Sequence, residues 1–242
     1  MLAAINVQKI YENTLHVIRG VSMEIEKGIT VGLLGESGCG KSTLARMLCC
    51  LERCSKGAVE LDGRICNGPH FKFRDASLPE EFRRKVQIIF QDSNGSLDPR
   101  MTVRQAIAEP LGNFSPLYRR ASRKEKCRRI AGLLERVGLD IDKIYSYPHE
   151  LSGGQRQRVV IARALAADPE YLICDEPVSS LDAESRDGIM ALLVSLRKET
   201  GMGCLFISHD PVLTMQVSKR VYIMEDGRIT ETRFPGEGNK VL

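Results

Sequence analysis

The segment at positions 35–43 constrains the fold of this chain more than any other feature. It reads Gly-Glu-Ser-Gly-Cys-Gly-Lys-Ser-Thr, and an apolar run at 29–34 precedes it, while a helical pattern at 43–50 follows it. Residues without side chains let the backbone wrap closely around an anion, and a helix that begins near Lys41 adds its positive end. The residues of this kind are Gly35, Gly38 and Gly40. The order of strand, loop and helix therefore predicts a phosphate-binding loop in an α/β fold.

The side chains of this loop indicate which ligand it holds. Lys41 can reach the β- and γ-phosphates of a nucleotide, and the hydroxyl of Ser42 can bind Mg²⁺. The residues expected to contact the nucleotide are Gly35, Ser37, Gly38, Cys39, Gly40, Lys41, Ser42 and Thr43. A glycine-rich turn can also arise for structural reasons alone, but the elements on either side favour a nucleoside triphosphate site.

A second candidate site follows a buried strand. The apolar run at 171–174 ends in Asp175 and Glu176. In an open α/β sheet, ligands bind at the carboxyl ends of the strands. We therefore expect Asp175 to hold Mg²⁺, directly or through water, and Glu176 to polarise an attacking water. The alternative is that the two acids only start a turn before Pro177.

Length and composition limit the class of protein. A chain of 242 residues can form one large domain, or one domain with an inserted subdomain. The net charge of +4 is too small to indicate a nucleic-acid partner. No apolar run approaches the roughly 18–20 residues that cross a bilayer, and the N-terminus lacks the pattern of a signal peptide. We therefore expect the chain to stay in the cytosol.

The cysteines show neither a CxxC pair nor a completed metal-site pattern, so we expect reduced thiols in a reducing compartment. The eight positions are Cys39, Cys49, Cys50, Cys54, Cys66, Cys127, Cys174 and Cys204. Cys39 lies in the phosphate loop beside an expected helix N-terminus, which favours a thiolate. Oxidation of Cys39 would then block nucleotide binding, although an unreactive loop residue is the favoured interpretation.

Hydrophobic patterns divide the chain into β-rich ends and a helical middle. The strands expected first are 4–10, 17–26, 29–34, 57–61 and 85–90, with a turn at Asp62-Gly63. The helices expected next are one from Thr102 to just before Pro110, one at 123–137 and one at 156–167. The elements expected last are strand 171–174, helix 184–198, strand 203–207, a helix from about 210 and strand 220–224.

This order predicts a mostly parallel sheet flanked by helices, with an N-terminal antiparallel β subdomain and an inserted α-helical subdomain. We expect one domain over 1–242, in which 1–90 and 167–242 form the nucleotide-binding core and 91–166 the helical subdomain. The stretch 119–129 is strongly basic and lacks interleaved aromatic residues. A solvated helix face is the favoured interpretation of that stretch, and contact with an acidic partner or lipid headgroups is the alternative.

Leu151-Ser152-Gly153-Gly154-Gln155, before the helix at 156–167, resembles the signature of the ATP-binding cassette (ABC) ATPases. A serine hydroxyl, glycine amides and a helix dipole suit a second phosphate. In that family the signature loop acts in trans, so each nucleotide lies between the phosphate loop of one subunit and the signature loop of another. The resemblance thus implies that Ser152, Gly153, Gly154 and Gln155 contact a neighbour's nucleotide.

Further elements of the family follow in order along the chain. Tyr11 matches the aromatic that stacks on adenine, and Gln91 matches the glutamine that senses Mg²⁺ and water. Asp182, in Ser180-Leu181-Asp182, matches the loop that crosses to the opposite subunit, and His209 matches the histidine that contacts the γ-phosphate. The resemblance therefore implies an ATPase with ATP and Mg²⁺ as ligands. Its catalytic residues would be Lys41, Glu176 and His209, and its Mg²⁺ ligands Ser42, Gln91 and Asp175.

Two linkers, 91–100 and 147–158, resemble the branch of the family that powers di- and oligopeptide and nickel importers. This implies a peripheral subunit on the cytoplasmic side of the membrane. Its partners would be a second, non-identical ABC ATPase, two transmembrane permease subunits and an extracytoplasmic substrate-binding protein. The chain stops soon after Arg228, so we expect none of the C-terminal extension found on many subunits of that branch.

Two other classes of cassette remain open. Subunits of the phosphonate-degrading carbon–phosphorus lyase machinery carry closely similar motifs, so this chain could serve a cytosolic enzyme complex instead. Cassettes that act on nucleic acids usually carry long coiled-coil insertions or two fused cassettes. Neither feature is present, and we expect no nucleic-acid partner.

Overall fold

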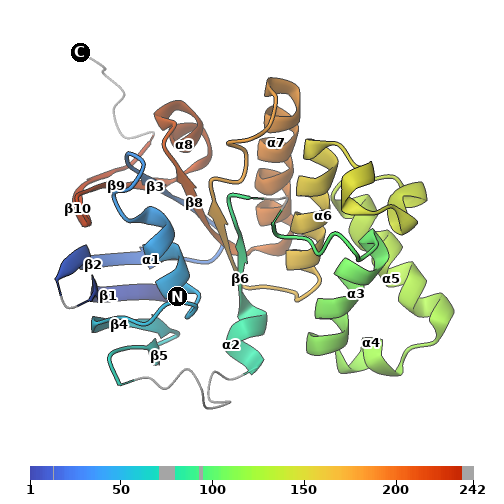
Figure 1. Ribbon diagram of the computed structural model, residues 1–242, viewed down its shortest axis with the longest axis horizontal. Helices are drawn as coiled ribbons and strands as arrows, with labels where there is room; N and C mark the ends of the chain where they lie inside the picture. The colour runs from blue at the N-terminus through green and yellow to red at the C-terminus, as the bar shows by residue number, and fades with distance from the viewer. Residues whose placement is uncertain (13, 71–79, 93–94, 236–242) are drawn as a thin grey trace. The chain divides into compact units, whose positions relative to one another are not determined.

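A computed structural model describes residues 1–12, 14–70, 80–92 and 95–235 of the chain (Figure 1). The chain forms two compact units. The first unit comprises Met1–Ile88, Glu170–Glu176 and the chain from Leu196 onward, and the second comprises Ile89–Pro169 and Pro177–Ser195.

An antiparallel sheet opens the first unit. Its strands follow the spatial order β2-β1-β4-β5. Their bounds are β1 (Leu2–Tyr11), β2 (Leu15–Ile25), β4 (Lys56–Leu61) and β5 (Arg64–Asn67). Asp62 and Gly63 join β4 to β5 with φ angles of 51° and 76°, the left-handed backbone that a tight two-residue hairpin requires. The predicted antiparallel β subdomain is confirmed.

A six-stranded sheet follows the spatial order β10-β9-β3-β8-β7-β6. The bounds are β3 (Thr30–Leu34), β6 (Val86–Ile89), β7 (Tyr171–Asp175), β8 (Gly203–Ser208), β9 (Arg220–Glu225) and β10 (Arg228–Arg233). The pairs β3–β8, β3–β9 and β7–β8 are parallel, and β10 pairs antiparallel with β9. Every residue of β7 and β8 is buried, as expected for central strands of a parallel sheet.

Among its described residues, the first unit contains α1 (Lys41–Leu48), α2 (Glu80–Lys85) and α8 (Pro211–Val217), together with the end of α7 (Ala183–Thr200). Its hydrophobic core joins both sheets to α1. Fully buried side chains such as Ile18, Leu33, Leu44 and Tyr171 belong to this single cluster. The strand–loop–helix order predicted around the phosphate loop is therefore present, and it rests on a continuous core.

The second unit is helical, as Figure 1 shows, and contains α3, α4, α5, α6 and the start of α7. The bounds are α3 (Val103–Phe114), α4 (Pro116–Arg120), α5 (Arg123–Arg136), α6 (Gly153–Leu165) and α7 (Ala183–Thr200), with 3₁₀ turns at Ile141–Tyr145 and Pro148–Glu150. Helix α6 packs against α3 and α5. None of the helices in the described ranges is long and apolar enough to span a bilayer.

The structure corrects the predicted end of helix α3. Helix α3 continues through Pro110 to Phe114, although the sequence predicts an end before that proline. A proline inside a helix removes one hydrogen bond and crowds the preceding turn. Helix α3 tolerates it because Ile107, Pro110 and Leu111 are buried and because the side chains of Thr102 and Gln105 form a capping box at its start.

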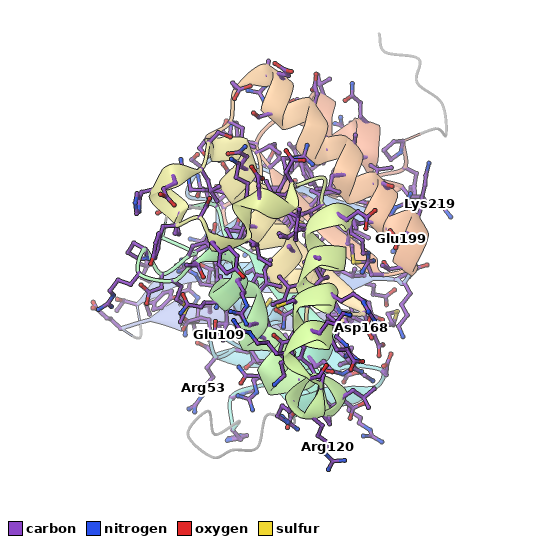
Figure 2. All side chains as sticks on the ribbon, turned by 90° about the vertical axis from the view of Figure 1, so that its right-hand side faces the viewer. Arg53, Glu109, Arg120, Asp168, Glu199 and Lys219 are labelled. Atoms are coloured by element: carbon purple, nitrogen blue, oxygen red, sulfur yellow. The ribbon has the colours of Figure 1, made fainter. Side chains whose placement is uncertain are left out.

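The basic stretch forms the outer side of α4 and α5. Arg120, Arg123, Lys124 and Arg128 are exposed, whereas Ile130 and other residues of the predicted apolar stripe are buried. Figure 2 shows Arg120 projecting away from the ribbon. The pattern is that of an amphipathic helix with a solvated basic face.

Candidate nucleotide site

The phosphate loop lies between β3 and α1. Gly40 occupies the N-cap position of α1 with a φ of 111°, a conformation that residues with a Cβ rarely adopt. A Cβ added there would lie 2.8 Å from Cδ1 of Ile18 and 3.1 Å from the carbonyl oxygen of Val17. Both the backbone conformation and the space therefore require glycine at this position.

Lys41 is held inside the loop. Its side chain folds back, and Nζ donates to the carbonyl oxygens of Gly35 at 2.7 Å and of Glu36 at 2.8 Å. The residue is buried, with 5% of its surface exposed, although charged side chains are seldom buried without an ionic partner. Both hydrogen-bond acceptors are neutral carbonyl oxygens, so this loop is suited to an anionic ligand.

Asp175 ends β7 and is also buried, with 4% of its surface exposed. Burial raises the pKa of its carboxyl group, while a hydrogen bond from Ser42 and the positive charges of Arg46 and Lys41 act in the opposite direction. The Oδ1 atom of Asp175 is buried and makes no hydrogen bond. A carboxylate oxygen left unpaired beside a serine hydroxyl suits Mg²⁺, which prefers such oxygen ligands.

Glu176 and His209 follow the neighbouring strands β7 and β8. The Nδ1 atom of His209 lies 3.3 Å from Oε2 of Glu176. Glu176 has a left-handed φ of 48°, and its amide donates to the carbonyl oxygen of Ile207 at 3.0 Å. This bond fixes the start of the turn after β7, so the two functional side chains meet at the carboxyl edge of the sheet.

Tyr11 is the last residue of β1 in the first unit. It pairs with Leu15 across the β1–β2 hairpin, and β2 then delivers Val17 and Ile18 to the position next to Gly40. The ring of Tyr11 is half-buried. The first unit therefore carries Tyr11, the loop at 35–43, Asp175, Glu176 and His209, and the contact of Tyr11 with a nucleotide stays a prediction.

The signature segment starts α6 in the second unit. The amide of Gln155 donates to Oγ of Ser152 at 3.2 Å, and the amide of Ser152 donates to Oε1 of Gln155 at 3.0 Å. This capping box fixes the first turn of α6. Since a serine hydroxyl both accepts and donates, Ser152 can still offer its hydrogen to a ligand.

The first turn of α7 and the residues just before it pack against this turn. A Cβ added to Gly154 would lie 2.9 Å from Oγ of Ser185, and one added to Gly153 would lie 3.4 Å from Cδ2 of Leu181. Asp182 accepts a hydrogen bond from the amide of Ser185 at 2.9 Å, and this bond lowers the pKa of its carboxyl group. The second unit therefore joins the signature residues to Asp182.

Three further observations complete the comparison with the predicted site. Gln91 is exposed just after β6 in the second unit, and its role as a Mg²⁺ ligand stays a prediction. In the linker 91–100, Ser93 and Asn94 lie outside the described residues. The sequence reading missed Arg46, whose charge acts on Asp175. Its position four residues after Ser42, on the same face of α1, was the available signal.

Comparisons with known proteins agree with this geometry. A family model described as "ABC transporter" matches residues 18–179. The chain is 45% identical over 218 residues to OppF, an oligopeptide transport ATP-binding protein of Bacillus subtilis, which covers 90% of this chain and 69% of that protein. It is 42% identical over 221 residues to NikE, a nickel import ATP-binding protein of Escherichia coli, which covers 91% of this chain and 79% of that protein. The chain spans about two thirds of the length of the peptide-transport relatives it matches.

A solved structure is also similar over nearly the whole chain. It is the dimeric structure of the ATP-binding cassette MJ0796 in a post-hydrolysis state, bound to ADP and Pi. Its TM-score is 0.84 at 29% identity, and the match covers 98% of this chain and 100% of that chain.

Proposed function

The chain belongs to the ABC transporter family, and we propose that it is the ATP-hydrolysing subunit of an importer for peptides, nickel or a metal chelate. The observation that carries the proposal is its identity of 42–45% with an oligopeptide and a nickel import protein over at least 90% of the chain. The linkers at 91–100 and 147–158 favour the same branch.

The proposed complex contains three kinds of partner protein around this chain. A second, non-identical ABC ATPase closes against it, two transmembrane permease subunits carry the cargo, and an extracytoplasmic protein delivers it. The chain itself lies on the cytoplasmic side of the membrane as a peripheral subunit. The dimeric state of the similar cassette MJ0796 supports the pairing of two cassettes.

The first unit binds the nucleotide in this proposal. Tyr11 stacks on the base, while the loop amides and Lys41 hold the phosphates. Ser42 and Asp175 would hold Mg²⁺, which would supply positive charge to the phosphate oxygens, and Gln91 stays a further predicted ligand. Lys41 exchanges its two loop carbonyls for phosphate oxygens, since a charge-assisted hydrogen bond is stronger than one to a neutral carbonyl.

Hydrolysis then depends on the pair at the edge of the sheet. Glu176 accepts a hydrogen bond from a water and orients it toward the γ-phosphorus, and His209 donates to a γ-phosphate oxygen. The water oxygen bonds to the γ-phosphorus as the bond to the β,γ-bridging oxygen breaks, and ADP and phosphate form. Ser152, Gly153 and Gly154 of this chain contact the γ-phosphate held by the neighbouring cassette, so its loss releases the dimer.

The test is purification of the tagged full-length chain from its native membrane. We expect two multi-span membrane proteins and a second ABC ATPase to co-purify. In proteoliposomes, the purified complex should hydrolyse ATP faster when its substrate-binding protein is loaded. Co-purification with cytosolic enzymes alone would contradict the importer and favour the role in an enzyme complex.

A further inference from the structure

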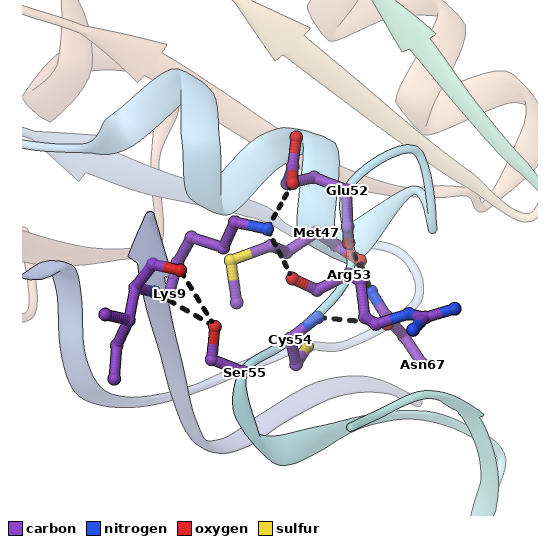
Figure 3. A network of polar contacts seen from close by, with 8 residues as sticks. Lys9, Met47, Glu52, Arg53, Cys54, Ser55 and Asn67 are labelled. Atoms are coloured by element: carbon purple, nitrogen blue, oxygen red, sulfur yellow. Dashed lines mark hydrogen bonds and ion pairs between the residues drawn. The ribbon is translucent and has the colours of Figure 1, made fainter. Parts of the chain in front are cut away.

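A buried lysine lies beneath the tyrosine proposed to stack on the base. Nζ of Lys9 lies 4.6 Å from the centre of the Tyr11 ring. The side chain of Lys9 is only 11% exposed, and it forms an ion pair with the carboxylate of Glu52. Its Nζ also donates to the carbonyl oxygen of Arg53 at 3.1 Å, as Figure 3 shows. Glu52 and Arg53 therefore hold the ammonium of Lys9 in place, and the same ammonium lies over one face of the Tyr11 ring.

The turn that carries Glu52 is itself rigidly attached to α1. The amide of Glu52 donates to the carbonyl oxygen of Arg46 at 3.2 Å. The buried side chain of Asn67 donates to the carbonyl oxygens of Glu52 at 2.7 Å and of Met47 at 2.9 Å. Helix α1 begins at the phosphate loop, so the same helix supports both the loop and the turn that holds Lys9.

Glu52 is the counter-charge of Lys9. The nearby thiol of Cys54 does not compete for this role, because burial raises its pKa to about 11 despite the positive charge of Lys9. A lysine held by a carboxylate and a carbonyl has lost most of its freedom of rotation, so its position is well defined. Such a cation attracts the face of an aromatic ring.

Tyr11, by contrast, has a weak backbone attachment. It is the last residue of β1, and Glu12 after it has a left-handed φ of 50°. The carbonyl oxygen of Tyr11 accepts from Thr14 at 3.1 Å, within the tight hairpin, and the paired Leu15 is exposed. The contact with Lys9 therefore gives one face of the ring a fixed partner.

We propose that Lys9, held by Glu52, is a positioning residue for the nucleotide base. It fixes the Tyr11 ring so that the face opposite the ammonium is ready to stack on adenine. This inference rests on the proposed function, since it assumes that ATP binds at Tyr11. If Lys9 only stabilised the fold, its replacement would not weaken binding of a ligand with a base more than binding of a ligand without one.

The decisive experiment compares a ligand that carries a base with one that lacks it. Calorimetric titration of the full chain would use a non-hydrolysable ATP analogue and tripolyphosphate, each with Mg²⁺. We expect Lys9→Met to weaken binding of the analogue by about three- to tenfold and to leave tripolyphosphate unchanged. In a Tyr11→Ala background, Lys9→Met should add almost nothing. Equal weakening of both ligands, or full additivity with Tyr11→Ala, would overturn the inference.

Matched variants guard against loss of folding. Lys9→Met leaves the Glu52 carboxylate unpaired, so the double variant Lys9→Met with Glu52→Gln removes both charges and should show the same selective loss. Lys9→Arg should restore binding of the analogue. Lys27 also forms an ion pair, with Glu170, and lies 6.0 Å from the ring centre of Tyr171. Lys27→Met should leave both affinities unchanged.

A second readout needs no nucleotide. The chain contains no tryptophan, so Tyr11→Trp places a single fluorescent indole at the site. We expect its time-resolved anisotropy to show a fast local motion only when Lys9→Met is added. An indole equally rigid in both proteins would overturn the inference while leaving the proposed function intact. A wild-type chain that binds neither the analogue nor tripolyphosphate would overturn the proposed function as well.

Discussion

The imidazole of His209 lies against the carboxylate of Glu176, with 3.3 Å between Nδ1 and Oε2. Glu176 has 11% of its side chain exposed and His209 has 58%. The carboxylate of Glu176 is thus mostly buried, and the imidazole of His209 is the more exposed member of the pair. This arrangement suits an acid that orients water and a histidine that reaches a phosphate above it.

Glu176→Gln should separate binding from hydrolysis. The amide keeps the size of the side chain but cannot draw a proton from water, so we expect ATP affinity to stay within about twofold and turnover to fall by about 10²–10⁴-fold. Phosphate release and ATP binding, measured on the same preparation, check both values. Glu26→Gln is the matched control, because Glu26 forms an ion pair with Arg220 away from the proposed site. Normal turnover in Glu176→Gln would refute the role of that residue.

Gly40→Ala should weaken both the fold and the site. Alanine at a φ of 111° is strained by about 1–3 kcal/mol, and its Cβ would press on Ile18 and on the backbone of Val17. We expect a lower melting temperature and ATP affinity reduced by at least about tenfold. Gly63→Ala is the control, since its φ of 76° is also left-handed but a Cβ there meets nothing within 4 Å. That variant should lose stability and keep its ATP affinity, and equal affinity loss in both variants would contradict the prediction.

Asp175→Asn should stabilise the nucleotide-free protein at neutral pH. Burial raises the folded-state pKa of this carboxyl, so its charged form is disfavoured in the fold. The fold therefore holds a proton more tightly than the unfolded chain, and wild-type stability falls as pH rises from about 4 through the folded pKa. We expect the variant to melt at a higher temperature than the wild type at pH 7, with a difference that shrinks as pH falls toward 4.

Asp62→Asn is the control, because the pKa of Asp62 is shifted in the direction opposite to that of Asp175. A hydrogen bond from the N-terminal ammonium lowers the pKa of Asp62, so its contribution to stability is present above about pH 4 and is lost as pH falls. Asp62→Asn should therefore melt at a lower temperature than the wild type at pH 7. Added Mg²⁺ and ATP should stabilise Asp62→Asn but not Asp175→Asn. A lower melting temperature for nucleotide-free Asp175→Asn at pH 7 would contradict the electrostatic argument.

Gly154→Val should impair only the step that needs the neighbouring cassette. Its Cβ would lie 2.9 Å from Oγ and 3.1 Å from Cβ of Ser185, so Ser185 or the first turn of α6 must shift. We expect unchanged ATP affinity in the isolated chain and turnover reduced by at least about tenfold in the assembled complex, because one displaced phosphate donor costs about that much or more. Gly132→Val is the control, since a Cβ at Gly132 meets nothing within 4 Å. Full turnover of the Gly154→Val complex would exclude the signature loop from the reaction.

The sequence predicts the long apolar elements well and the short polar ones poorly. Strand β10 was missed because its residues, Arg228–Arg233, are mostly charged or polar, and it forms by pairing with the buried β9. Strand β5 was missed because four residues carry too little pattern. The expected helix at 43–50 ends at Leu48, because Cys50 turns into a left-handed conformation with a φ of 56°. Such ends are decided by local backbone geometry that periodicity does not carry.

Some features of the candidate site can likewise be predicted from the sequence, and others cannot. The loop at 35–43, Asp175 and Glu176 are visible in the sequence because their chemistry requires fixed spacing after a strand. The buried, unpaired oxygen of Asp175 and the ammonium of Lys9 beneath Tyr11 are not visible there. Both depend on contacts between residues far apart in the chain, which only the folded structure reveals.

Binding of ATP with Mg²⁺ to the wild type and to Lys41→Met, measured by calorimetric titration, tests the central claim most directly. Methionine is similar in length to lysine, but it lacks the ammonium group that donates to the carbonyl oxygens of Gly35 and Glu36. We expect saturable binding at one site per wild-type chain and affinity reduced by at least about 100-fold in the variant, a loss of about 2.7 kcal/mol. Equal affinities in the two proteins would show that the nucleotide is not held by this loop.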